Sequence, residues 1–253
     1  MKKRMGVVSF AQNASEFRKQ NNSRRISSLK EISEYAKKNR VTHILFPGDT
    51  IINKRQDAAL RKKYIQLMLR LFPRQSIIFE IKPYGVYAIQ RATIIGKPIR
   101  QILVTSRASK DCYYELWQDT FIQNNRIREL GGIRFLIWVC GEINILRNSQ
   151  SNRNKVTGLR YAFDRKYSVH KLHYDVFVNP THNMLTNLYN KYKERLKYMS
   201  RQSRTGIINL NVDISQKQRT GSLMVFRNGK ELITKNEKKK WYGKYWVMEI
   251  IDV

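Results

Sequence analysis

Cysteine, acidic residues and long apolar runs are all scarce in this sequence. Two cysteines, Cys112 and Cys140, cannot build a disulfide framework, and their spacing fits no zinc site. No apolar run reaches the roughly 20 residues of a membrane-spanning helix, and the N-terminal one is too short for a signal peptide. We therefore expect a cytoplasmic protein with reduced thiols and no membrane segment.

The shortage of acidic residues gives the chain an unusual charge. Its 49 lysines and arginines outnumber 19 aspartates and glutamates, so the formal net charge is +30. Such a surface attracts polyanions, because binding releases their condensed counterions. A nucleic acid, a nucleotide or an acidic protein is therefore a candidate partner. The alternative is a solvated basic surface without a specific ligand.

Apolar residues make up 42% of the 253 residues, enough for one large domain to bury a sizeable core. They recur at helical spacing within 26–36, 60–71 and 185–199. Short apolar runs predict strands at 5–12, 42–47, 76–81, 86–94, 99–105, 132–140, 174–179, 205–213, 221–226 and 231–234. Strand and helix alternate first and antiparallel-looking strands follow, which indicates an α/β fold with mixed sheets covered by helices.

We find neither an internal repeat nor an interdomain linker, and we expect one domain over residues 1–235. The segment 147–171 is polar and basic and is expected to be an exposed loop. Asn228-Gly229 predicts a hairpin turn between the last two strands of the domain. Residues 236–253 are expected to be a basic and aromatic tail that ends in a strand.

The residues around Cys140 are the strongest candidate for chemistry. Cys140 ends the apolar run and is followed at once by Gly141 and Glu142. A thiol at the mouth of a buried strand can act as a nucleophile when a neighbouring base removes its proton. A free cysteine is also commonly buried as a small hydrophobic residue, so its position alone leaves both interpretations open.

Several segments, taken in order, resemble the carbon–nitrogen hydrolase (nitrilase) superfamily. They are residues 7–13, Phe46-Pro47, Val139-Cys140-Gly141-Glu142, 175–181, 206–211 and 221–232, and the resemblance extends over roughly residues 5–235. It implies a nitrilase-like α-β-β-α sandwich of mixed sheets that pairs into a homodimer. It also implies a Glu-Lys-Cys triad that works without a metal or a cofactor.

The resemblance assigns the nucleophile to Cys140. A carboxylate takes the thiol proton, and the thiolate attacks an amide or nitrile carbon. A lysine ammonium stabilises the oxyanion, ammonia or an amine leaves, and water hydrolyses the thioester. The family's glutamate follows the proline that ends the second strand. This chain has Gly48 there and Asp49 next, so Asp49 is the candidate base.

The other site residues also follow from the resemblance. Lys110 lies 30 residues before the nucleophile and is the candidate for the oxyanion lysine, with Arg107 as an alternative charge. Glu115 is a candidate further acid near the substrate, with Glu129 as an alternative. Glu142, the acid of the nucleophile turn, is expected to hold that turn in place. His182 follows the strand that ends near the family's pocket, which makes it either a substrate-lining residue or an ordinary loop histidine.

We therefore expect a thiol-dependent, amidase-like C–N hydrolase whose substrate is an anionic small molecule or is linked to a macromolecule. An alternative is a catalytically degenerate protein of the same fold that binds nucleic acid or another polyanion, since Gly48 replaces the glutamate. A third interpretation is a PD-(D/E)xK-like nuclease, in which Asp49 and Glu80 hold Mg²⁺ and Lys82 positions the attacking water.

Overall fold

A computed structural model gives the architecture. It describes residues 3–12, 22–53, 55–101, 126–149, 155–159, 172–182, 189–202, 204–210, 212–213, 223–233 and 245–253. The candidate residues Lys110, Arg107 and Glu115 lie outside these ranges, as does most of the strand expected at 99–105.

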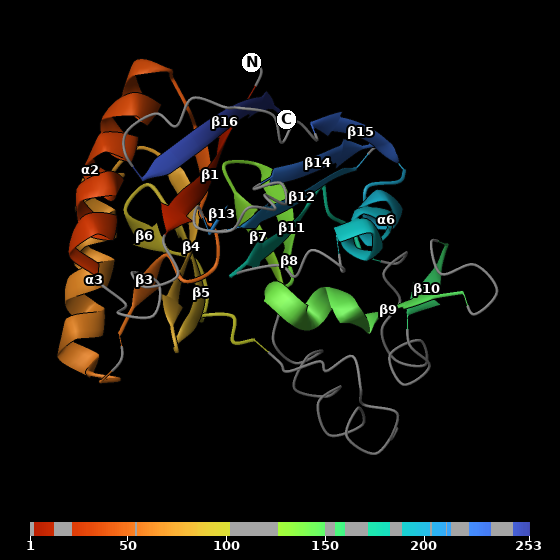
Figure 1. The fold of residues 1–253 in the computed structure, drawn as a ribbon. Coiled ribbons are helices and arrows are strands. Elements are labelled where there is room, and N and C mark those ends of the chain that lie inside the picture. Colours follow the sequence, from red (N-terminus) through yellow and green to blue (C-terminus); the bar gives the residue numbers. More distant parts are fainter. Residues whose placement is uncertain are drawn as a thin grey trace.

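Two mixed β-sheets lie face to face and carry helices on their outer faces (Figure 1). The first sheet has the order β13-β1-β2-β4-β5-β6, with β16 also paired to β1 and β3 to β4. Its strands are β1 (Arg4–Gln12), β2 (His43–Leu45), β3 (Ile51–Ile52), β4 (Ser76–Lys82), β5 (Gly85–Gln90), β6 (Thr93–Ile94), β13 (Val212–Asp213) and β16 (Trp246–Asp252).

The second sheet has the order β15-β14-β12-β11-β8-β7. Its strands are β7 (Ile127–Leu130), β8 (Ile133–Ile137), β11 (Val176–Thr181), β12 (Thr205–Leu210), β14 (Leu223–Arg227) and β15 (Lys230–Ile233). A small separate hairpin is formed by β9 (Leu146–Asn148) and β10 (Val156–Leu159). This hairpin lies within the segment expected to be a loop, so that expectation was wrong for these two strands.

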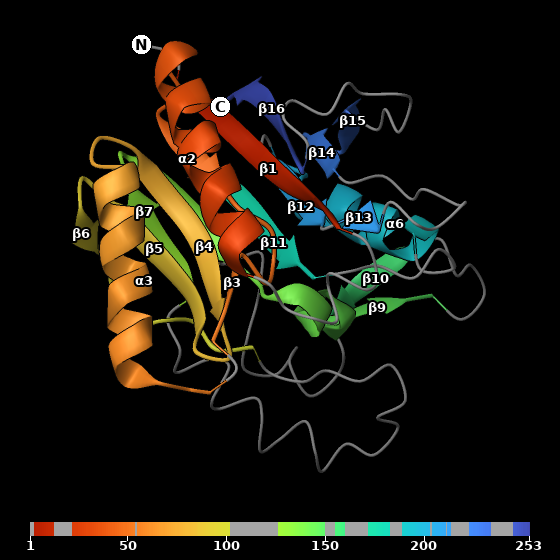
Figure 2. The same ribbon diagram turned by 60° about the vertical axis from the view of Figure 1, so that its left-hand side comes forward.

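Helices α2 (Asn22–Lys38) and α3 (Ala58–Leu71) cover the first sheet, while α6 (Tyr189–Met199) and the 3₁₀-helix η1 (Cys140–Ile145) cover the second (Figure 2). Asp57 begins α3, because its carboxylate accepts hydrogen bonds from the backbone N–H groups of Ala59 and Leu60 at 2.7 and 3.1 Å. None of the described helices is both long and apolar enough to cross a membrane.

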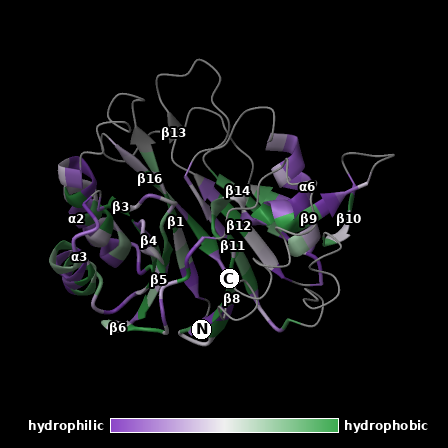
Figure 3. Cartoon of the chain, turned by 90° about the horizontal axis from the view of Figure 1, so that it is seen from below, coloured by the Kyte–Doolittle hydropathy of each residue, from purple (hydrophilic) through white to green (hydrophobic). Residues whose placement is uncertain are grey.

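Three separate apolar cores fill the three spaces between these four layers. Alternate strand residues divide between them, as the two-residue period of a strand requires. On β1, Met5 and Val7 join the core between the sheets, whereas Val8 and Phe10 face α2 and α3. Figure 3 colours the chain by residue hydropathy, and hydrophobic segments (green) occur on strands of both sheets, such as β5 and β14. The sequence prediction of an α-β-β-α sandwich of mixed sheets is confirmed.

A buried asparagine joins the two sheets. Asn209 of β12 donates hydrogen bonds to the carbonyl oxygens of Val8 on β1 and Leu45 on β2, at 2.9 and 3.4 Å. At the same ends of the strands, the backbone N–H of Gly48 donates to the carbonyl of Thr181 at 3.2 Å. The ends of β2 and β11 are therefore adjacent, although they are distant in sequence.

Candidate active site

Cys140 lies where β8 ends and η1 begins, and Asn179 holds this turn. The side-chain amide of Asn179 donates to the carbonyl oxygens of Trp138 and Cys140, at 2.6 and 2.9 Å. Thr181 donates in turn to the side-chain oxygen of Asn179 at 2.9 Å, which fixes the orientation of the amide. Cys140 has a φ of 45°, a left-handed conformation that is uncommon for residues other than glycine. The turn thus keeps the half-buried thiol at a fixed place.

Glu142 stabilises the same turn through a hydrogen bond to its backbone. It is fully buried and accepts a hydrogen bond from the backbone N–H of Val139 at 2.7 Å. The guanidinium of Arg126 pairs with both carboxylate oxygens, at 3.0 and 3.1 Å. A buried carboxylate needs this compensation. In this geometry Glu142 is bound to the backbone of the turn and to Arg126.

We expect Asn179→Leu to lower the free energy of unfolding by about 1–3 kcal/mol, because it leaves the buried carbonyl of Trp138 and the partly buried carbonyl of Cys140 without their donor. Urea denaturation measures this loss. Asn209→Leu is the matched control, since it also removes a buried amide that donates to two carbonyls. Both variants should lose stability, but only Asn179→Leu should also lower the rate of Cys140 alkylation. Equal alkylation rates in both variants would contradict the role of Asn179.

His182 occupies the space where a side chain on residue 48 would lie. A Cβ atom built on Gly48 would lie 2.6 Å from Cδ2 of the His182 ring and 2.8 Å from its backbone nitrogen. Such contacts are far too close for any side chain to be accommodated without rearrangement. A glutamate at position 48 and the observed place of His182 therefore exclude each other.

The His182 ring connects the thiol to two buried carboxylates. Its imidazole forms a hydrogen bond with Cys140. Its Nε2 lies 2.7 Å from an oxygen of Glu80 and 3.2 Å from an oxygen of Asp49. Burial acts to lower the pKa of His182, but the hydrogen bonds and charges of Cys140 and Glu80 outweigh burial and raise the pKa to about 11. His182 is consequently protonated at neutral pH.

Asp49 and Glu80 are buried and tied to each other. The backbone N–H of Asp49, whose φ is 54°, donates to the Glu80 carboxylate at 2.6 Å. The Lys82 ammonium lies 3.3 Å from the Asp49 carboxylate, and Arg25 of α2 donates to the Asp49 carbonyl. Burial acts to raise the pKa of Glu80, but its hydrogen bond and ion pair with His182 bring the pKa below the ordinary value.

The charges of this cluster are almost balanced. Burial lowers the pKa of Arg25 to about 10 against the opposing charges of Asp49 and Glu80, so Arg25 is still charged at neutral pH. With Lys82 and His182 the cluster holds three cations and two carboxylates. A Cys140 thiolate beside His182 would supply the missing negative charge. The arrangement is suited to an ion pair of thiolate and imidazolium.

The same carboxylates could hold a divalent cation. Ligand atoms of Asp49, Glu80 and His182 all lie within 4.8 Å of one another. Such a mixture of nitrogen and oxygen donors suits a divalent ion. Lys82 and Arg25 already supply positive charge at this place, however, which a bound cation would have to oppose.

The pH dependence of stability tests the charge of His182. Because its folded-state pKa of about 11 lies above the ordinary 6.5, folding favours the protonated form. The resulting stabilisation is complete below pH 6.5 and is lost progressively as the pH rises toward 11. We expect the stability difference between the wild type and His182→Gln to shrink from pH 6.5 to 10, measured by urea denaturation. A difference that grows over this range would contradict the assignment.

The lowered pKa of Glu80 affects the stability of the fold at acid pH. Its contribution to stability is complete above its ordinary pKa of 4.5 and is lost as the pH falls through the lower folded-state value. Comparison of Glu80→Gln with the wild type below pH 4.5 separates this contribution from that of His182.

The structure brings several of the predicted residues together and adds others. Cys140 and His182 are in contact, and Asp49 reaches His182, while Glu142 lies beneath the turn. Asp49, Glu80 and Lys82 also cluster, as the nuclease interpretation requires, but they do so within the four-layer sandwich. Glu80 was not predicted to lie near the thiol. The signal was a single acid within the otherwise apolar run Ser-Ile-Ile-Phe-Glu-Ile-Lys of β4.

Arg25 is a second residue of the site that was not predicted. Its guanidinium is buried behind the carboxylates, and it is carried by the inner face of α2. The only signal in the sequence is that this cation falls on the apolar stripe of the helix, next to Leu29 and Ile32.

Comparison of the whole fold with solved structures identifies its architecture. A carbon–nitrogen hydrolase from Helicobacter pylori G27 is similar over 100% of this chain and 90% of its own, with a TM-score of 0.63 and 11% identity. A CN-hydrolase superfamily protein from Xanthomonas campestris matches over 99% and 91%, with a TM-score of 0.60 and 10% identity. An amidase from Nesterenkonia sp. is similar over 99% of this chain and 90% of its own, with a TM-score of 0.58 and 9% identity.

No protein-family model matches the sequence, and no curated protein sequence does either. The chain therefore has the fold of the carbon–nitrogen hydrolases at very low sequence identity. Identities of this size establish the fold, and the chemistry has to be argued from the site itself.

Proposed function

We propose that this chain is a divergent thiol-dependent carbon–nitrogen hydrolase in which His182 replaces the glutamate base of the family it resembles. The observation that carries the proposal is that His182, at the end of β11, lies where a side chain on residue 48, just after β2, would lie. Gly48 leaves a space, and His182 fills it while bonded to Cys140 on one side and to buried carboxylates on the other. A nucleophile, a base and an orienting acid are the parts that thiol catalysis needs.

The proposed reaction proceeds through a thioester. The Cys140 thiolate attacks the carbonyl carbon of an amide, and protonated His182 gives its proton to the departing nitrogen as the C–N bond breaks. Neutral His182 then takes a proton from water, which attacks the thioester and releases a carboxylic acid. The thiolate and the imidazolium are thereby restored, so one amide and one water yield one acid and one amine or ammonia.

The buried carboxylates keep the imidazole in place and stabilise its charged form. Glu80 makes the shorter contact with Nε2, and Asp49, which we had expected to be the base, becomes a second support. The backbone N–H of Asp49 also donates to Glu80, so one carboxylate positions the other. Lys110, with Arg107 as the alternative, is the proposed oxyanion cation, Glu115 the proposed substrate contact, and Glu142 the proposed support of the turn.

The substrate is proposed to be a primary amide or nitrile that carries a negative charge or is attached to a macromolecule, since the net charge of the chain is +30. The experiment measures ammonia release from matched panels of neutral and carboxylate-bearing amides and nitriles. Acid quenching followed by peptide mass spectrometry should find the acyl group on the peptide that contains Cys140. An acyl group on another residue, or product formation without an acylated peptide, would contradict the mechanism.

A parallel arm of the same experiment addresses the metal-ion interpretation, which the spacing of Asp49, Glu80 and His182 motivates. Under the thiol mechanism, EDTA leaves ammonia release unchanged and iodoacetamide abolishes it. Cleavage of plasmid DNA that requires Mg²⁺ and is lost in Glu80→Ala, with no effect of iodoacetamide, would favour a nuclease instead.

A further inference from the structure

The outer face of α3 carries cations without any acidic side chain. Lys62, Lys63 and Arg70 are exposed on the helix, and Arg74 is exposed just beyond its end. From Ala58 to Phe79 the sequence contains no aspartate or glutamate. None of the four cations has an ion-pair partner in the part of the chain that the structure describes. Their charges are therefore open to an external anion.

Two of these residues lie along the helix with a glutamine between them. Lys62, Gln66 and Arg70 are each separated by four positions, so they are neighbours along the helix surface, and Arg74 follows just beyond the helix end. Lys62 and Arg70 are about 12 Å apart at a rise of about 1.5 Å per residue, a length over which one strand of a duplex presents about three or four phosphates. We call Lys62, Gln66, Arg70 and Arg74 the α3 stripe.

The opposite side of the helix fixes the α3 stripe in place. Tyr64, Met68 and Phe72 are buried in the core between α3 and the first sheet. A cation line on a packed helix keeps its spacing, so a regular polyanion can meet several charges at once. The same packing argues against a membrane surface, because the apolar face that an interfacial helix would insert is already used.

The chemistry of the α3 stripe also argues against an acidic protein partner. The centres of protein interfaces are rich in aromatic and apolar side chains and poor in lysine. On α3 the exposed apolar side chains are only Ala58 and Ala59. The large exposed hydrophobic residues among those described are Ile94 and Leu232, and neither lies on this helix. Lysine, arginine and glutamine are instead the residues that contact phosphate groups.

We propose that the α3 stripe binds the phosphate backbone of a nucleic acid, without reading its base sequence. This inference goes beyond the hydrolase proposal and does not depend on it, since the stripe shares no residue with the Cys140 site. It gives the +30 net charge a defined place of contact on the folded chain.

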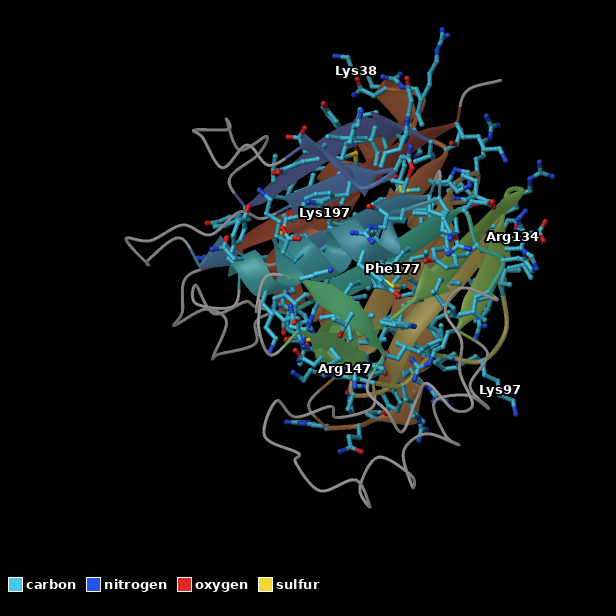
Figure 4. The ribbon with its side chains drawn as sticks, turned by 90° about the vertical axis from the view of Figure 1, so that its right-hand side faces the viewer. Lys38, Lys97, Arg134, Arg147, Phe177 and Lys197 are labelled. Atoms are coloured by element: carbon cyan, nitrogen blue, oxygen red, sulfur yellow. The ribbon has the colours of Figure 1, made fainter. Side chains whose placement is uncertain are left out.

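The experiment measures binding of the full chain to a fluorescent 20-base-pair DNA duplex and a 20-nucleotide single-stranded RNA by anisotropy. The triple variant Lys62→Glu, Arg70→Glu and Arg74→Glu removes the α3 stripe. The matched control reverses Lys97, Lys197 and Lys230, which are exposed or half-exposed cations on other elements. Lys97 extends from the surface in Figure 4, and Lys197 belongs to α6, in the other helical layer. Both triple variants change the net charge equally.

We expect the α3 variant to lose at least tenfold in affinity at 100 mM salt, and the control less than threefold. The slope of log affinity against log salt concentration should fall by about three in the α3 variant, because each neutralised phosphate contributes about 0.9. Equal losses in both variants would overturn the proposal, because they indicate diffuse attraction. So would absent binding of the wild type, or stronger binding of polyglutamate or of anionic vesicles than of either nucleic acid.

Measuring amide hydrolysis distinguishes a failure of the nucleic-acid proposal from a failure of the hydrolase proposal. Ammonia release by the α3 variant should equal that of the wild type, whether or not it binds nucleic acid. Far-ultraviolet circular dichroism shows whether the helix is intact in both variants.

Discussion

Cys140→Ala is expected to reduce amide hydrolysis to the buffer background, a loss of at least about 10⁴-fold in kcat/KM, while the fold is retained. Removal of a catalytic nucleophile typically costs this much or more, because the remaining groups can only bind and polarise the substrate. The thiol is half-buried at the edge of the core between the sheets, so its removal deletes few packing contacts. Ammonia release at substrate concentrations well below KM measures the effect.

Cys140→Ser is the control for shape, because it keeps a group that can hydrogen-bond at the same place. We expect it to be as inactive as the alanine variant, since a hydroxyl is far harder to ionise than a thiol. NMR titration gives a second measurement. Cys140 is one of the groups that raise the pKa of His182, so this pKa should be lower in Cys140→Ala than in the wild type. Retained hydrolysis with an unchanged His182 pKa would remove the thiol from the mechanism.

His182→Gln is expected to reduce kcat/KM by about 10³-fold, through the loss of the group that moves protons to the leaving nitrogen and from water. Glutamine keeps hydrogen-bonding capacity beside Glu80 but cannot carry a proton in this way. The rate of ammonia release should fall while binding of the substrate, measured on the inactive variants, changes little. Wild-type hydrolysis in His182→Gln would mean that another base serves Cys140.

A paired exchange tests why His182 is there. Gly48→Glu alone should destabilise the chain, since its side chain would collide with the His182 ring. His182→Gly alone should be inactive and less stable than the wild type, because it removes the cation that pairs with the buried carboxylates of Glu80 and Asp49. Their combination removes the contact with the imidazole ring, but the backbone atoms of Thr181 and residue 182, at 2.9 and 2.8 Å from the new Cβ atom, must also shift. With that shift, we expect hydrolysis at least tenfold above His182→Gly. If the double variant hydrolyses amides no faster than His182→Gly, a glutamate at position 48 cannot take over the role of His182.

The fold could be predicted from the sequence because its signals are local. Apolar alternation and runs gave β1, β4 and β8, while Pro73 marked the end of α3 within two residues. Asn228-Gly229 forms the expected turn between β14 and β15, with φ of 49° and 73°. The hairpin of β9 and β10 was missed because its strands are only three and four residues long, so the buried Leu146, Val156 and Leu159 form no recognisable alternation within a polar segment.

The site was only partly predictable, because its central contact joins residues that are distant in the sequence. Cys140 was recognised from its neighbours, and Asp49 was chosen as the base because it follows the position where a glutamate was expected. The structure places His182 between Asp49 and the thiol. The relation between Gly48 and His182 depends on two strand ends that meet only in the folded chain. No pattern of spacing along the sequence contains it.

The close approach of the ends of β2 and β11 has a consequence for how such proteins are recognised. A base beside the nucleophile can come from the end of either strand, provided that the backbone at residues 181 and 182 moves away when residue 48 carries a side chain. Residue 48 and residue 182 should then change together in related chains, glycine with histidine or glutamate with a smaller residue. A search for a fixed glutamate after Pro47 would pass over every chain that carries the exchanged pair.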